Sequence, residues 1–228
     1  MAAGTTVAAA GLALLSSTPA EAAQVYNAVP SAFAAYGHYL GLLLIMLSLT
    51  TERLLIKEDM PEDDFDKVAI ADGLYGIAGL LVTVTGYLRV TQYAKGWEFY
   101  QHEPIFWVKM LLFCVTGAAS FFPTTKIIQR AVAKRNDPTV PPMSPKLVKR
   151  MTSIINAELL AIGSIPLAAT LMARGVGYAD WLPWQAGAAP AVLALGGLGY
   201  KYIKEALDWT EDAPVKEDAP DKEAQAAP

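Results

Sequence analysis

One histidine stands where it could bind a metal ion inside a membrane. His38 lies in the run Tyr-Gly-His-Tyr-Leu-Gly near the start of the first long apolar segment. Gly37 and Gly41 leave room beside its ring for a planar group or for a closely packed helix. A neutral imidazole is a common ligand of haem iron and of other metal ions. His38 is therefore a candidate axial ligand, although a histidine that only hydrogen-bonds a neighbouring helix fits the same pattern.

Three cations fall at the same predicted level of the membrane as His38. Arg89 ends the second apolar segment, Lys109 comes early in the third, and Arg174 ends the fourth. The segments hold no acidic residue at this level, although acids in the adjoining loops could neutralise the charge. The cations favour an anionic ligand, and the propionates of haem b or a related tetrapyrrole would pair with them. The other histidine, His102, is a second ligand only if its loop folds inward.

A second set of polar residues falls near the opposite predicted surface. It consists of Glu52, Arg53, Asp72, Asn156 and Glu158. Ionisable groups at membrane depth are costly, so they face the bundle interior or mark a functional site. Because this set mixes signs, it can form a hydrogen-bonded ion-pair network that fixes the register of the helices.

The segments that carry these residues predict an all-α integral membrane bundle. The chain is 54% hydrophobic and only 18% charged, with mean hydropathy +0.30. Each segment has about the 20 apolar residues that a membrane-spanning helix needs. Four core segments are expected at residues 32–56, 68–88, 105–122 and 151–173, which places the four-helix core within 32–177. A fifth segment, 184–204, is rich in Gly, Ala and Pro, and either spans or lies at the interface.

The two ends of the chain differ from the core. Residues 1–23 contain a short apolar stretch and an Ala-x-Ala pattern, which predicts a cleavable export or thylakoid-type signal. No basic residue precedes Arg53, so the signal is either part of a longer plastid presequence or an unusual bacterial one, and a disordered Ala-rich tail is the alternative. Residues 209–228 are Ala, Pro and charged residues, which predicts a disordered acidic tail.

The basic residues predict the orientation. With the N-terminus outside, or in the lumen, 14 of the 18 basic residues fall on the inner side and 4 on the outer side. The basic loop between the third and fourth segments is expected to contact anionic lipid, and its lack of interleaved aromatic residues argues against nucleic-acid binding. Small residues on the second segment and on 184–204 predict close contact with a partner in a membrane complex. On the second segment they are Gly76, Gly79, Thr83 and Gly86, in line with Asp72.

The core resembles a family of predicted membrane proteins of unknown function from cyanobacteria, other bacteria and plastid-bearing eukaryotes. The resemblance covers about two thirds of the chain, and the matching pieces occur in order. They are HYLG at 38–41, ER at 52–53, ADGLYG at 71–76, TGYLR at 85–89, FWVK at 106–109, FPT at 122–124 and LMARG at 171–175.

The core is also distantly similar to the CopD-like superfamily, which includes the membrane haem-binding protoporphyrinogen oxidase. His38, the Leu-Tyr pair at 74–75, Lys109 and the Asn and Glu of 156–158 fall at similar places. This similarity implies haem at His38. Trp107 is one residue too close to Lys109, Ala157 separates the Asn and Glu, and no histidine follows the third segment. These departures argue against oxidase activity.

Three functions fit the sequence. The first is a haem or tetrapyrrole protein with His38 as the metal ligand. The second is a non-enzymatic accessory subunit or assembly factor of a photosynthetic membrane complex. The third is a small-ion or metal transporter, disfavoured because the segments lack clustered soft ligands. The signal pattern, the acidic tail and the family favour a plastid thylakoid, with a bacterial inner membrane as the alternative. Whether the protein turns over a substrate stays open.

Overall fold

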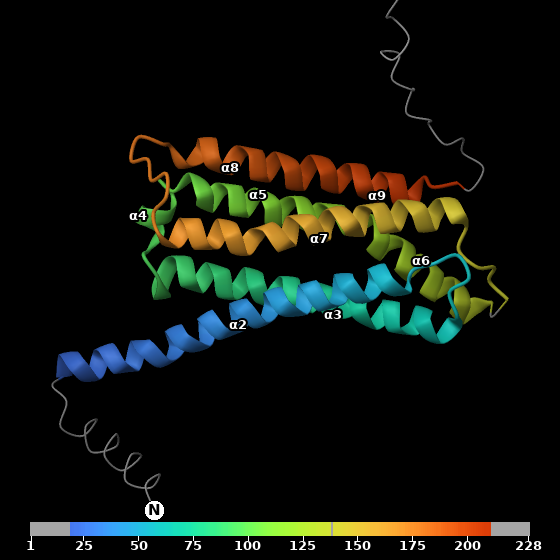
Figure 1. Ribbon diagram of the computed structural model, residues 1–228, viewed down its shortest axis with the longest axis horizontal. Helices are drawn as coiled ribbons and strands as arrows, with labels where there is room; N and C mark the ends of the chain where they lie inside the picture. Colours follow the sequence, from blue (N-terminus) through green and yellow to red (C-terminus); the bar gives the residue numbers. More distant parts are fainter. Residues whose placement is uncertain (1–18, 138, 211–228) are drawn as a thin grey trace, which may run out of the picture.

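The computed structural model describes residues 19–137 and 139–210, and every regular element in this part of the chain is helical (Figure 1). The expected signal and acidic tail largely lie outside the described residues, which exclude 1–18 and 211–228. The elements are α2 (Pro19–Leu55), α3 (Glu62–Leu88), η1 (Arg89–Tyr93), α4 (Trp97–Tyr100), α5 (Pro104–Ala119), α6 (Phe121–Asn136), α7 (Pro145–Ala173), α8 (Trp184–Leu193), η2 (Ala194–Leu198) and α9 (Gly199–Leu207).

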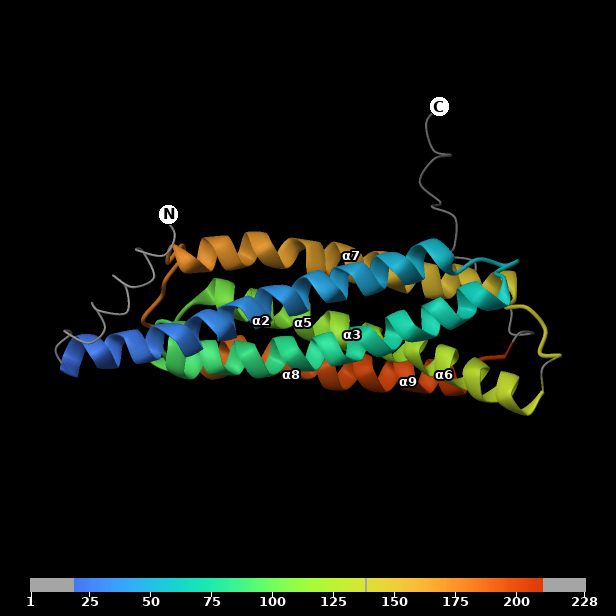
Figure 2. The same cartoon turned by 90° about the horizontal axis from the view of Figure 1, so that it is seen from below.

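Four helical stretches in the described part of the chain are long and apolar enough to cross a membrane. They are Ala28–Leu55, Glu62–Tyr93, Pro104–Asn136 and Pro145–Ala173. Each coincides with one of the four core segments expected from hydropathy, and the first ends at Leu55, one residue before the expected end. Figures 1 and 2 show the long helices running alongside one another in a bundle. The expected all-α integral membrane fold is confirmed.

Local sequence explains where two of these helices begin. α3 begins six residues earlier than hydropathy indicated, because Glu62, Asp63 and Asp64 occupy its first turn. Acidic side chains there interact favourably with the helix dipole and so extend the helix beyond its apolar part. α7 begins with Pro145 in its first turn, and Ser144 caps it by accepting a hydrogen bond from the Leu147 backbone amide at 3.1 Å.

α2 and α3 pack closely against each other next to His38. A Cβ on Gly41 would lie 2.6 Å from Val82 Cγ2 and 3.2 Å from the Ala78 carbonyl oxygen. One on Gly37 would lie 3.2 Å from Thr85 Cγ2. The glycines therefore allow the backbone of α2 to approach α3 more closely than a side chain would permit.

The third span is interrupted between α5 and α6, and its second part is a helix where the sequence predicted a basic loop. α5 ends at Ala119, and α6 continues as a helix to Asn136, so most of the predicted loop is helical. Pro123 lies in the first turn of α6, where its missing amide costs little, but it cannot donate to the last carbonyls of α5. Figure 1 shows α6 bending away from the line of α5.

The fifth segment forms consecutive helices that lie along the bundle. α8, η2 and α9 follow one another without a break, and they contact α5 and α6 (Figure 1). The backbone of α8 lies directly on the indole of Trp107, because a Cβ on Gly187 would overlap that ring. Whether this segment spans the membrane stays a prediction.

We expect Gly187→Ala to destabilise the protein, because the added methyl group must displace either Trp107 or α8. Overpacking of this kind costs about 1–3 kcal/mol. Thermal unfolding of the detergent-purified variant measures the effect. Gly163→Ala is the control, since a Cβ at that exposed helical position meets nothing within 4 Å. Equal melting temperatures for the two variants would contradict the close contact of α8 with Trp107.

Candidate functional site

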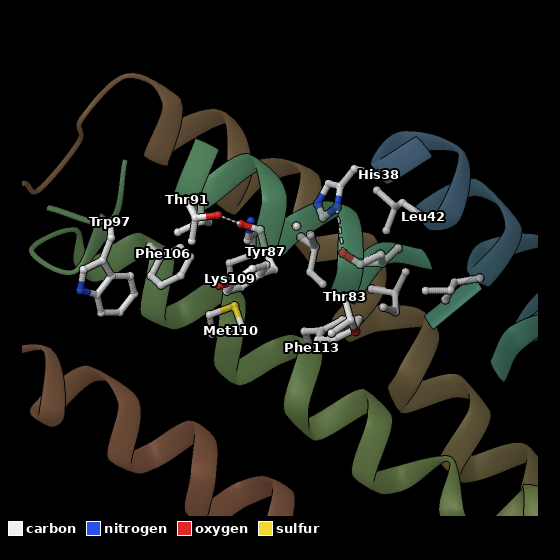
Figure 3. A pocket seen from close by; sticks show the side chains of 16 residues that line it. His38, Leu42, Thr83, Tyr87, Thr91, Trp97, Phe106, Lys109, Met110 and Phe113 are labelled. Atoms are coloured by element: carbon white, nitrogen blue, oxygen red, sulfur yellow. Dashed lines mark hydrogen bonds between the residues drawn. The ribbon is translucent and has the colours of Figure 1, made fainter. Parts of the chain in front are cut away.

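A cavity of about 440 Å³ lies inside the bundle beside His38 (Figure 3). Its walls come from α2, α3, η1, α4, α5 and α7, and most of the side chains that line them are apolar. Its polar lining comes from His38, Lys109, Tyr87 and two threonines, Thr83 and Thr91. The size lies within the range of about 300–1,000 Å³ that is usual for small-molecule and cofactor sites.

His38 is held by hydrogen bonds on one of its two ring nitrogens. Its Nδ1 atom lies 3.1 Å from the Val82 carbonyl oxygen and 3.2 Å from Thr85 Oγ1. The Thr85 hydroxyl donates to the Leu81 carbonyl at 2.6 Å, which leaves its oxygen to accept from the ring. Because both partners accept, the proton of a neutral His38 lies on Nδ1, and Nε2 keeps a lone pair.

The opposite helix also fits closely around His38. A Cβ on Gly86 would lie 3.1 Å from His38 Cε1. The ring therefore packs on the α3 backbone at Gly86 and is anchored through its Nδ1 atom to Val82 and Thr85. In Figure 3 the His38 ring stands on the wall formed by α2 and α3. This arrangement is typical of metal-binding histidines, whose second nitrogen is fixed by a backbone carbonyl or another acceptor.

Of the three cations expected beside His38, Lys109 is the one that lines the cavity. Its Nζ atom lies 5.8 Å from the centroid of the Phe106 ring. Arg89 lies over the Tyr39 ring at 5.1 Å and is not among the residues that line the cavity. Arg174 is exposed at the end of α7 and donates to the Thr170 carbonyl at 3.1 Å.

His102 is held away from the cavity. Its Nδ1 atom lies 2.9 Å from the Leu182 carbonyl oxygen, and its ring makes an edge contact with Tyr178. The loop of His102 is thus tied to the segment that precedes α8. No group of three or more His, Cys, Asp or Glu residues that could hold a metal ion occurs among the described residues.

Sequence reasoning missed the aromatic wall of the cavity. Trp97 of α4 and Phe106 of α5 both line it, and their rings meet edge to face with centroids 6.5 Å apart. Trp97 lies between the second and third expected segments, outside the four core segments. The signal that could have found it is the short spacing between Trp97 and Phe106, which lets the α4 turn fold back over the start of α5.

The polar residues at the other end of the bundle form no ion pairs, contrary to expectation. Arg53 Nε donates to Asn156 Oδ1 at 2.6 Å, and the Thr124 hydroxyl donates to Asp72. None of the ion pairs within the described residues involves Glu52, Asp72 or Glu158. The reason is helical geometry, because adjacent residues point about 100° apart, so Glu52 faces the core while the half-buried Arg53 points toward Asn156 of α7.

The row of glycines on α3 is covered by another described helix at one end only. Gly76 and Gly79 would meet nothing within 4 Å if they carried a Cβ, whereas Gly86 faces His38. The predicted contact face for a partner in a complex is therefore open at its centre.

Comparison with known proteins identifies one family. The family model described as "Predicted membrane protein (DUF2214)" matches residues 30–177, which is more than half of the chain. This match confirms the resemblance to an uncharacterised membrane family, while the similarity to the CopD-like superfamily stays a prediction. No curated protein matches the chain, and no solved structure does.

The geometry predicts one tautomer for His38. We expect ¹⁵N spectra of histidine-labelled protein to show a protonated Nδ1 and an unprotonated Nε2 at alkaline pH. The chain has only two histidines, and His102→Asn assigns the signals by removing one of them. A His38 signal with a protonated Nε2 would contradict the hydrogen bonds to Val82 and Thr85.

Proposed function

We propose that this chain, which belongs to the DUF2214 family of predicted membrane proteins, binds haem b or a related tetrapyrrole in the cavity beside His38. The observation that carries the proposal is the anchored His38 ring, whose Nδ1 atom is occupied by Val82 and Thr85 while Nε2 keeps its lone pair. An anchored imidazole at the wall of an apolar cavity is the arrangement that an axial iron ligand needs.

The cavity suits a flat apolar macrocycle. Leu42, Ile45, Val82, Phe113 and Ile162 supply apolar surface from four helices. The rings of Trp97 and Phe106 add aromatic surface beyond them. Such a lining excludes water and binds an apolar ligand by the hydrophobic effect, while a few polar groups fix its orientation.

Lys109 supports the assignment of an acidic tetrapyrrole. Among the described residues that line the cavity, Lys109 is the one lysine or arginine. Its ammonium group would pair with a propionate. The proposal therefore retains Lys109 as the principal cation and leaves Arg89 and Arg174 outside the cavity wall. A bound haem would supply one-electron redox chemistry, and the chain would contribute its ligand, its orientation and a water-poor surrounding.

A second candidate function is that of an accessory subunit of a membrane complex. The open space beside Gly76 and Gly79 favours it, because small residues on an uncovered helical face permit close approach of another helix. The two functions are compatible, because the uncovered face lies at Gly76 and Gly79 of α3, whereas the His38 ring of α2 packs on α3 at Gly86. The signal pattern and the acidic tail support a thylakoid location for either function, with a bacterial inner membrane as the alternative.

The visible spectrum of the detergent-purified protein tests the proposal. We expect a Soret band that shifts on reduction and that is lost in His38→Ala, because the axial nitrogen is removed. His102→Ala is the matched control, since His102 is tied to the Leu182 carbonyl outside the cavity, and its variant should keep the spectrum. A wild-type protein that stays colourless after incubation with hemin, or an unchanged His38→Ala spectrum, would overturn the assignment.

Lys109→Met should weaken hemin binding about 10- to 160-fold, because a charge-assisted bond contributes roughly 1.5–3 kcal/mol. Hemin titration followed by tryptophan quenching measures the affinity. Arg174→Met removes an exposed cation outside the cavity and should leave the affinity unchanged. Equal losses in both variants would indicate a general charge effect and would contradict a specific role for Lys109.

A further inference from the structure

Two glutamates with unpartnered carboxyl oxygens are buried in the half of the bundle that contains the turn between α2 and α3. The exposed fraction of Glu158 is 1% and that of Glu52 is 2%. Both carboxylate oxygens of Glu158 lack a hydrogen-bond partner, and so does Oε1 of Glu52. The free-energy cost of burying these carboxyl groups is therefore offset by something other than hydrogen bonds from the described residues.

The charged groups that face these glutamates are themselves acidic. Glu52 of α2 and Glu158 of α7 lie on either side of the hydrogen bond between Arg53 and Asn156, which joins these two helices at 2.6 Å. From α6, the neutral hydroxyl of Thr124 donates to Asp72. Three acidic side chains, one each from α2, α3 and α7, thus lie in this half of the bundle.

The cations on the surrounding helices are engaged elsewhere. Arg53, which follows Glu52 in α2, donates to Asn156. Arg150 of α7 makes a two-bond ion pair with Glu205 of α9, at 2.6 and 2.9 Å. Neither guanidinium is paired with Glu52, Asp72 or Glu158.

An unpaired carboxylate in this position would be very costly. Moving an ionised carboxylate from water into an apolar interior costs several kcal/mol even after relaxation, and repulsion among like charges adds to the cost. A metal ion could balance the charge, but the described residues hold no group of three His, Cys, Asp or Glu with suitable geometry. A proton needs no such geometry, since it binds to a single oxygen.

We propose that Glu52, Asp72 and Glu158 form a proton-binding site in the core of the bundle, with Glu158 as the innermost proton carrier. Glu52 and Glu158 are fully buried, whereas Asp72 is half-buried and bonded to Thr124 at the start of α6. The three carboxyls therefore lead from the core toward the α5–α6 break. Protons exchange through Asp72 with the side of the membrane that the turn between α2 and α3 faces. This site is separate from the His38 cavity and does not depend on haem binding.

Dicyclohexylcarbodiimide tests the site, because this apolar reagent reacts with protonated carboxylic acids in membranes. The carboxyl O–H adds across one C=N bond, and the product rearranges to a stable N-acylurea that retains all atoms of both reactants. We expect peptide mass spectrometry of the full chain in liposomes to find this adduct on Glu158 or Glu52 at neutral pH. The exposed Glu98 is the internal control and should stay unlabelled.

The pH dependence of labelling identifies the occupant. Above the pH at which the site loses its proton, each further pH unit should lower labelling about tenfold, because the protonated fraction falls by that factor. Protection by millimolar Na⁺ or Ca²⁺ at constant pH would reveal a metal ion and overturn the assignment. Absence of any adduct on Glu52 and Glu158 would also overturn it, provided that the same peptides are labelled in protein unfolded by detergent at acidic pH.

Glu158→Gln supplies an independent readout. An amide has nearly the shape of a protonated carboxyl group, so this variant should keep the melting temperature of the wild type while losing the adduct at position 158. A carboxylate balanced by a cation would instead lose stability when its charge is removed. A fall in melting temperature for both Glu158→Gln and Glu52→Gln would contradict the proton assignment.

Discussion

The close contact between α2 and α3 fixes the geometry of the candidate site. Gly41 brings the α2 backbone against Val82, and the Val82 carbonyl accepts the hydrogen bond from His38, which lies one turn earlier on the same face of α2. A larger residue at Gly41 would separate the helices and lengthen that bond. Gly86 acts in the same way from α3, because it leaves the space that the His38 ring occupies.

The packing of α8 extends this constraint to the other wall of the cavity. Gly187 allows the α8 backbone to cover Trp107, and the ring of Trp107 meets that of Trp97, which lines the cavity, at a centroid distance of 6.0 Å. The indole nitrogen of Trp107 donates to the Gln101 carbonyl at 3.0 Å and so ties the α4 turn to α5. The helix outside the matched family region thus supports the aromatic side of the site.

Hydropathy was sufficient for the four spans because each is a long apolar run in a chain whose loops are strongly polar. It failed for α6, where basic residues suggested a loop although their backbone continues as a helix beyond the break near Pro123. For the site, sequence identified His38 and Lys109 but also grouped Arg174 with them. Order along the chain fixes the depth of a residue in the membrane, but not the direction in which its side chain points. For the same reason, the sequence did not show that the side chains of Arg53 and Glu52 point in different directions.

The positions of His38 and Glu52 on one helix have an electrical consequence. They are 14 residues apart in α2, which corresponds to about 21 Å along the helix axis. That is roughly two thirds of a hydrocarbon core about 30 Å thick. A charge moved from one position to the other would therefore cross most of the transmembrane voltage, and a 100 mV potential would do about 1.5 kcal/mol of work on it. Charge states at these two positions of α2 are coupled to the polarisation of the membrane, whatever ligands they hold.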